Sequence, residues 1–297
     1  MKRFTALIGL FVLLLLGAEL YARFALGLGQ PPLYVTHPTI EYMLAPDQDL
    51  RRFGKYHHYN ACGMRSPALD QITQPQRIMV FGDSVLNGGS QTDQSDLATS
   101  IATDSQSFFG NVSAGSWGPE NIAAWIEVFG FQGAQTAIIV ISAHDLYDTP
   151  TFAPLNPQTH PTKAPILALW EGIARYLPRY LPAFMKPPKA IAPPEISAPQ
   201  SIVKFIDLVA AADLRLCAIQ HQTRRELELP PSAAHTEIKA LFETRGAPVL
   251  DFGNAMRTAK DSAYQDDIHI TPKGQALLAG YLAECAQMAR IPTPLPH

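Results

Sequence analysis

Three polar residues at opposite ends of the chain have the types needed for nucleophilic catalysis. Ser84 lies in the tripeptide Gly82-Asp83-Ser84, directly after the apolar run 78–81, and Asp266 and His269 lie near the other end. A serine hydroxyl is a weak nucleophile, so it needs a base to take its proton and an acid to orient that base. We expect Ser84 to attack, His269 to act as the base, and Asp266 to hold the imidazole in the required tautomer.

The elements around these residues are predicted to bring them to one edge of a sheet. The apolar run before Ser84 predicts a buried strand, so Ser84 falls on the turn at the strand's carboxyl end, where open α/β sheets place reactive groups. Asp266 and His269 precede a predicted helix that Thr271 would cap and Pro272 would begin. That helix would anchor the loop.

From residue 77 onward, short apolar strands alternate with helices. This alternation predicts an α/β fold, a three-layer α/β/α domain around a parallel sheet of about five strands. The expected strands are 77–81, 111–113, 137–141, 214–219 and 248–251. The expected helices are 97–105, 119–131, 201–212, 233–244 and 271–289.

The chain divides into three expected parts: residues 1–29, an export signal; residues 30–76, an irregular connector packed on the main domain; and residues 77–297, that domain. The domain contains a proline-rich insert at about 149–200, in which we expect a helix over 166–176. The insert is interpreted as a lid or a substrate-side wall, or as an excursion without a catalytic role.

The N-terminus combines basic residues with an apolar run. Lys2 and Arg3 precede the uncharged run 4–18, which is about 15 residues long and shorter than the roughly 20 that span a bilayer. The segment 19–26 continues as an amphipathic helix that can lengthen the span. We favour an uncleaved inner-membrane anchor with the catalytic domain in the periplasm or outside the cell. The alternative is secretion after signal cleavage.

Composition excludes several classes of function. The net charge is -3 and the pI about 6.3, so no basic face is available for nucleic acid. Cys62, Cys217 and Cys285 are far apart without zinc spacing, and no nucleotide fingerprint occurs, so neither a metal nor a cofactor is expected. Cys217 and Cys285 lie in apolar stretches where a buried thiol is the default, although one bridge remains open. The adjacent His57 and His58 favour a surface strand, with the two side chains on opposite faces, over a metal site.

At its motifs the chain resembles an SGNH hydrolase of the GDSL type, in a membrane-anchored bacterial form. The resemblance covers roughly 77–289. Gly82-Asp83-Ser84 matches the first family block, Gly115 the second, and Asp266-Asp267-Ile268-His269 the last. It implies a flavodoxin-like fold, an ester hydrolase activity and an oxyanion hole that includes the backbone N–H groups of Ser84 and Gly115.

The third family block departs from the family pattern. The family has Gly-x-Asn-Asp after a strand, and this chain has Ser142-Ala143-His144-Asp145. His144 therefore stands where an asparagine amide would donate to the oxyanion. An imidazole N–H also donates, although its charge depends on pH. His144 is interpreted as an oxyanion donor or substrate contact, or as a structural loop histidine.

The resemblance implies a serine esterase that removes O-acetyl groups from an extracytoplasmic polysaccharide or glycoside through an acyl-serine. Its partner would be an acylated carbohydrate or another small ester. Two alternatives remain open: a polysaccharide O-acetyltransferase with the same triad, and a non-catalytic polysaccharide assembly or binding protein of the envelope. Trp117, Trp170 and Tyr176 are candidates for stacking on sugar rings, or for packing within the core and the insert.

Overall fold

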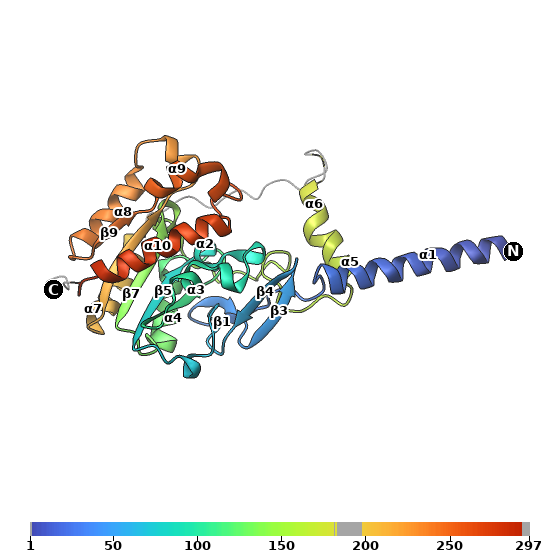
Figure 1. The fold of residues 1–297 in the computed structure, drawn as a ribbon, viewed down its shortest axis with the longest axis horizontal. Coiled ribbons are helices and arrows are strands. Elements are labelled where there is room, and N and C mark those ends of the chain that lie inside the picture. Colours follow the sequence, from blue (N-terminus) through green and yellow to red (C-terminus); the bar gives the residue numbers. More distant parts are fainter. Residues whose placement is uncertain (1, 181, 183–197, 293–297) are drawn as a thin grey trace.

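A five-stranded parallel sheet forms the centre of the molecule. The computed structural model describes residues 2–180, 182 and 198–292. The sheet has the strand order β6-β5-β7-β8-β9, with helices on both faces (Figure 1). Its strands are β5 (Gln76–Gly82), β6 (Ser107–Ser113), β7 (Thr136–Ser142), β8 (Arg215–His221) and β9 (Val249–Asp251). The predicted three-layer α/β/α fold is confirmed.

Alternate residues of the central strands enter two hydrophobic cores, because successive side chains of a strand point to opposite faces. In β5, Met79 and Phe81 join one core, whereas Ile78 and Val80 join the other. Every residue of β7 is buried. A strand that is covered on both faces has a continuous apolar run in its sequence, and such runs made these strands predictable.

Helices of the first core are α4 (Pro119–Phe129), α7 (Pro199–Ala211) and α8 (Ala233–Glu243). Helices of the second core are α2 (Ser84–Asn87), α3 (Ala98–Ala102), α9 (Gly253–Ala263) and α10 (Pro272–Met288). Short 3₁₀ turns occupy 69–71, 89–91, 94–96, 143–146 and 226–228. The α9 helix was not predicted from the sequence.

Residues 30–76 are more regular than expected. They form two antiparallel hairpins, β1 (Tyr34–His37) with β2 (Glu41–Leu44), and β3 (Gln48–Arg52) with β4 (Lys55–Tyr59). Tyr42, Leu44 and Tyr59 enter the first core, so the hairpins pack on the main domain. The strands are four or five residues long, too short for a clear period-2 pattern.

The predicted strand at His57 and His58 is β4, with the two side chains on opposite faces. Contrary to the sequence prediction, the strand is not wholly on the surface, because His57 is fully buried. The His58 ring reaches Asp49 in an exposed pair, with Nδ1 2.9 Å from Oδ1.

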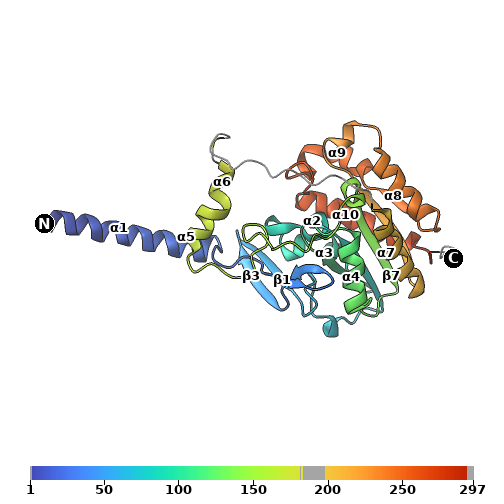
Figure 2. The ribbon, with the colours of Figure 1, turned by 180° about the vertical axis from the view of Figure 1, so that it is seen from behind.

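The N-terminal helix projects from the rest of the molecule (Figures 1 and 2). α1 (Lys2–Leu20) continues as a π-helical turn (Tyr21–Ala25). The stretch Arg3–Ala25 is 23 residues long with a mean hydropathy of 2.1, and among the described residues it alone is long and apolar enough to cross a membrane. It is compatible with a signal anchor or a signal peptide.

The described part of the proline-rich insert contains the expected helix. It consists of α5 (Ala168–Glu171), a π-helical turn (Gly172–Tyr176) and α6 (Leu177–Tyr180), and we call residues 168–180 the insert helix. Residues 181 and 183–197 of the insert lie outside the described residues.

A disulfide joins Cys217 of β8 to Cys285 of α10, with their Cα atoms 5.7 Å apart. The default expectation of two separate buried thiols was therefore wrong, and the bridge that the sequence left open is formed. Sequence spacing gave no signal, because 68 residues separate the two cysteines and only the packing of α10 on β8 brings them together. Cys62 remains a free thiol, half-buried.

Candidate active site

The expected catalytic residues lie at the carboxyl edge of the sheet, where the strand order reverses. β5 comes first of the five strands but lies between β6 and β7. The chain therefore passes from β5 to β6 on one side and then crosses to β7 on the other. Ligands of open α/β sheets bind at such a switch point. Gly82 is paired in register with Ser113, so Ser84 and Gly115 follow two residues beyond the same level on neighbouring strands.

Ser84, His269 and Asp266 form a continuous hydrogen-bonded chain. Ser84 Oγ is 3.0 Å from His269 Nε2, and His269 Nδ1 is 2.7 Å from Asp266 Oδ2. An ionised carboxylate accepts from Nδ1–H, which leaves Nε2 unprotonated and able to accept the serine proton. The three residues therefore have the geometry of a nucleophile, a base and an orienting acid.

The turn after β5 holds Ser84 as the first residue of α2. Asp83 caps this short helix, its Oδ1 accepting a 2.8 Å hydrogen bond from the Val85 N–H. Gly82 fits where β5, α2 and β7 meet, since a Cβ there would lie 3.0 Å from the Leu86 Cβ and 3.2 Å from the Val140 oxygen. The glycine of the Gly-Asp-Ser motif thus allows the close approach that aims the serine.

The loop that carries Asp266 and His269 is fixed by its own backbone. Asp266 Oδ1 accepts from the N–H groups of Ile268 and His269, at 2.9 and 2.8 Å. Burial alone would raise the pKa of Asp266, but the hydrogen bonds from the His269 side chain and these two N–H groups lower it. Asp266 is therefore a carboxylate at neutral pH. Thr271 caps α10 through the N–H of Gly274, as predicted.

A buried histidine that sequence reasoning missed supports the same loop. His221 ends β8, and its Nε2 donates to the carbonyl of Ile268, at 2.9 Å. Its full burial lowers the pKa to about 4, so the ring is neutral at physiological pH. His221 is a positioning residue, because it touches the loop between Asp266 and His269. Nothing in its local sequence distinguishes it from an ordinary strand residue.

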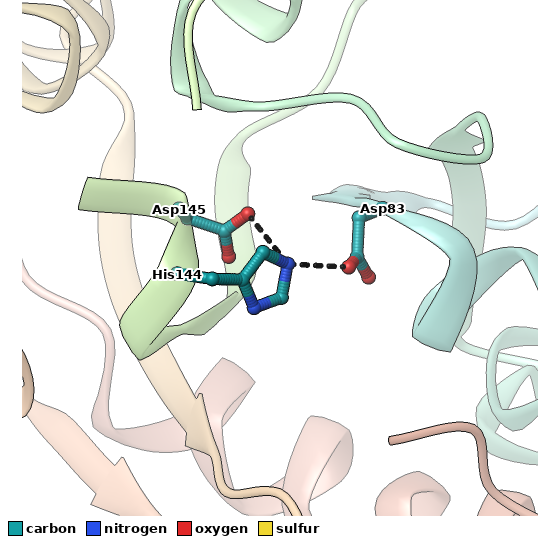
Figure 3. Close-up of side chains that lie close together, drawn as sticks. All are labelled: Asp83, His144 and Asp145. Carbon is teal, nitrogen blue, oxygen red and sulfur yellow. Dashed lines mark ion pairs between the residues drawn. The ribbon is translucent and has the colours of Figure 1, made fainter. Parts of the chain in front are cut away.

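His144 lies between two buried carboxylates, as Figure 3 shows. Its Nε2 is 3.5 Å from Asp83 Oδ2 and 3.6 Å from Asp145 Oδ1, while Nδ1 points away from both. Burial would lower the pKa of His144, but the hydrogen bond to Asp83 and the two negative charges raise it to about 9. Burial also raises the pKa of Asp145, because a charged carboxylate is costly there. His144 is therefore an imidazolium at neutral pH.

The same three residues are the group of described side chains best placed to hold a metal ion. The potential ligand atoms of Asp83, His144 and Asp145 all lie within 4.8 Å of one another. The sequence spacing gave no sign of this group, since two neighbouring loops contribute to it. A protonated imidazole beside two carboxylates offsets part of their negative charge.

A cavity of about 230 Å³ opens beside the Ser84 and His269 side chains. Gly88 and Gly89, which follow α2, are part of its wall. The remaining lining residues are Val85, Ser90, Gln91, Arg175, Tyr176, Gln265, Asp266 and Ile270. The proline-rich insert therefore contributes a wall to this cavity through Arg175 and Tyr176, one of the roles expected for it.

Three further residues near the sheet edge, Trp117, Asn121 and Asp267, have mainly structural contacts. Trp117 is buried, and its Nε1 donates to the Tyr42 carbonyl at 2.9 Å, so it packs in the core instead of presenting a stacking face. Asn121 accepts from the N–H of Gly118 at 3.0 Å, which caps α4. Asp267 lies beside Arg225, with 3.5 Å between its Oδ1 and Nε, and not against His269. Asp266 is thus the acid that the geometry selects.

The oxyanion donors expected from the sequence follow adjacent strands. Gly115 lies in the loop between β6 and α4, and its carbonyl accepts from the Tyr42 hydroxyl at 2.8 Å. This bond fixes the plane of the peptide group that follows Gly115. His144 is the second residue of the 3₁₀ turn (Ala143–Leu146) that follows β7. Ser84, Gly115 and His144 thus follow three neighbouring strands at the switch point, and their role as donors remains a prediction.

A nucleophile, base and acid at the switch point of a parallel sheet define the geometry of a serine hydrolase. No family model matches the chain, and no curated protein matches it. Similar solved structures include a protein from Desulfitobacterium hafniense DCB-2 that is described as lipolytic and of the G-D-S-L family. Its sequence identity to this chain is 10%. The match covers 71% of this chain and 99% of that one, with a TM-score of 0.42.

Two further similar structures are esterases. One is the psychrotrophic esterase EstA from Pseudoalteromonas sp., at 13% identity over 71% of this chain and 97% of the other, with a TM-score of 0.42. The other is a family 3 carbohydrate esterase from Clostridium thermocellum, at 11% identity over 72% and 99%, with a TM-score of 0.39.

Proposed function

We propose that this protein is a serine ester hydrolase whose nucleophile is Ser84. The observation that carries the proposal is the chain of hydrogen bonds from Ser84 Oγ through His269 to Asp266, at 3.0 and 2.7 Å. Those distances are within the reach that general-base activation of a hydroxyl requires. The adjoining cavity supplies a place for the ester.

The reaction divides into two steps. Ser84 Oγ attacks the ester carbonyl carbon while its proton passes to His269 Nε2, and the carbonyl oxygen becomes an oxyanion. The ester C–O bond then breaks, and His269 returns the proton to the leaving alcohol, which leaves an acyl-serine. Water then attacks the acyl carbon while His269 takes its proton. The bond between the acyl carbon and Ser84 Oγ breaks, and His269 returns the proton to Oγ, which releases the acid and restores free Ser84. Asp266 stays ionised and stabilises the imidazolium in both steps.

The oxyanion would be stabilised by three donors that follow β5, β6 and β7: the backbone N–H groups of Ser84 and Gly115, and the His144 ring. The positive charge on His144 suits that role, because charge-assisted donors are stronger than neutral ones.

Solvent exposure supports hydrolysis over acyl transfer. The side chains of His269 and Asp266 are 42% and 53% exposed. A transferase with the same triad must keep water from the acyl-serine, which an open base makes difficult. We therefore propose water as the acceptor. For the substrate we propose an O-acetylated polysaccharide or glycoside outside the cytoplasm, with α1 as an uncleaved membrane anchor.

Hydrolysis of p-nitrophenyl acetate tests the proposal. The full chain in detergent is the right material, because a chain starting near residue 30 would lose contacts of Glu19, Arg23 and Gly29 with the insert. We expect acetate release that disappears in Ser84→Ala, and a 1:1 covalent adduct of the wild type with a phosphonate ester. Equal rates in both proteins, with no adduct, would refute the esterase. Release that appears only when a sugar acceptor is added would select the transferase.

A further inference from the structure

The insert helix exposes an apolar stripe. Trp170, Ile173, Leu177 and Tyr180 are 62%, 52%, 47% and 83% exposed, and we call these four residues the apolar stripe. Their spacing of three, four and three residues places them along one side of the helix. A helix that packs on a globular domain normally turns its apolar side inward. Here the apolar side is the one left uncovered.

The opposite side of the insert helix is polar and buried against the domain. Glu171 is 5% exposed and pairs with the fully buried Arg52, with 2.6 Å between Oε1 and Nη2. The other oxygen of Glu171 accepts from the N–H of Gly29 at 2.6 Å. Arg52 also donates to the Tyr176 hydroxyl at 2.9 Å. These contacts fix the rotation of the helix, so the apolar stripe is held facing outward.

The start of the insert helix is fastened to the end of the membrane-spanning segment. The carboxylate of Glu19 accepts from the N–H groups of Ala168 and Leu169, at 2.8 and 2.9 Å. Arg23 donates to the carbonyl of Ile166 at 2.7 Å. From this junction the insert helix runs across the direction of α1 (Figures 1 and 2). Exposed apolar side chains also surround the junction: Leu20, Tyr21, Phe24, Ile166 and Leu167.

We propose that the insert helix lies flat on the membrane that α1 spans, with the apolar stripe in the boundary between headgroups and acyl chains. This proposal rests on the retention of α1 as an anchor. A helix that crosses the direction of a spanning helix lies along the membrane surface, and its apolar surface is continuous with that of the span. Tryptophan and tyrosine, which begin and end the stripe, favour that boundary. The apolar stripe therefore contacts lipid.

This placement brings the catalytic cavity to the membrane. Arg175 and Tyr176, on the same helix as the stripe, line the cavity beside Ser84. A helix is about 10 Å wide with its side chains, so the cavity opens about that far from the lipid boundary. Esters carried by amphiphilic molecules in the outer leaflet would then lie within reach of Ser84.

The chain contains its own probe for this contact. Trp117 and Trp125 are 2% and 1% exposed, so Trp170 is the exposed tryptophan of the three. Full-length protein in phosphatidylcholine vesicles with brominated acyl chains should show quenched tryptophan emission. Trp170→Phe should abolish the quenching. The readout does not involve Ser84, so it fails or succeeds independently of the esterase.

Charged substitutions make the test specific. Ile173→Glu/Leu177→Glu should lose the quenching by brominated lipid and make Trp170 accessible to iodide in water. Ile101→Glu/Val128→Glu is the matched control, because both side chains are 45% exposed on α3 and α4, and it should quench as the wild type does. Wild-type emission that iodide quenches and brominated lipid does not would overturn the proposal. So would a mass spectrum showing that the mature protein lacks α1.

Discussion

Replacing His144 by alanine should lower kcat by about 10²–10³-fold, the usual effect of removing one oxyanion donor. His144→Asn should retain most of the activity, because an amide N–H replaces the imidazolium N–H and resembles the family pattern. The expectation follows from the ring geometry. Nε2 faces Asp83 and Asp145, at 3.5 and 3.6 Å, so Nδ1–H is the donor left for substrate.

The charge of His144 also predicts a pH dependence of kcat. When the ring loses a proton, the carboxylates keep the remaining one on Nε2, and Nδ1 becomes an acceptor. With a pKa of about 9, about 90% of the rings are protonated at pH 8 and about 10% at pH 10. The wild-type kcat should therefore fall about tenfold between these pH values. His144→Asn has no such group and should show no fall.

The assay is initial-rate hydrolysis of p-nitrophenyl acetate from pH 6 to pH 10, with the spontaneous rate at each pH subtracted. Thermal unfolding of each variant separates lost catalysis from lost folding. An alanine variant that keeps a third or more of the wild-type kcat would refute the donor role. The same conclusion holds if the wild type and His144→Asn have superimposable profiles above pH 8.

Three further outcomes follow from buried charges. His57 and His221 have pKa values lowered by burial to about 3 and about 4, so between pH 6.5 and 4 the unfolded chain binds more protons than the folded one. Protonation of each histidine in the unfolded chain should lower the unfolding free energy by roughly 3 kcal/mol over that range. Urea titrations at pH 7 and pH 5 test this. The loss of unfolding free energy between the two pH values should be smaller for His57→Gln than for the wild type. Glu171→Ala should lower the unfolding free energy by about 3–5 kcal/mol, because it leaves Arg52 buried and unpaired. The double variant Glu171→Leu/Arg52→Met should recover most of that loss. Equal stabilities of the single and double variants would contradict this expectation. Extensive dialysis against EDTA should leave esterase activity unchanged, and a loss that zinc or magnesium restores would instead assign a metal to the cluster in Figure 3.

Much of the fold was predictable because its strands are buried on both faces. The runs in β5, β7 and β8 are continuous and apolar, and the order of motifs along the chain placed Ser84, Asp266 and His269 at one sheet edge. The helix α9 was missed because its sequence is mostly polar; Met256 and Ala263 are among the few side chains it buries. The hairpins of residues 34–59 escaped prediction because their strands are short.

The parts of the site that escaped prediction depend on contacts between distant segments. His221 reads as one more residue of a buried strand, and only the folded chain shows its Nε2 against Ile268. The imidazolium at His144 needs the carboxylate of Asp83 from a different loop. The sequence nevertheless identified His144 as unusual, because the residue departs from the family pattern. Its positive charge follows from the contacts with Asp83 and Asp145, which only the folded chain shows.

The Cys217–Cys285 bridge links chemistry to the compartment in which the chain folds. It closes a loop of 68 residues and ties the strand ending at His221 to the helix that follows His269. By loop closure alone, such a link disfavours the unfolded chain by about 4 kcal/mol. In a reducing cytosol that contribution is absent, since thiols there stay unlinked. In an exported form of the protein, the bridge would form only after translocation, and it would then rigidify the elements that flank His269.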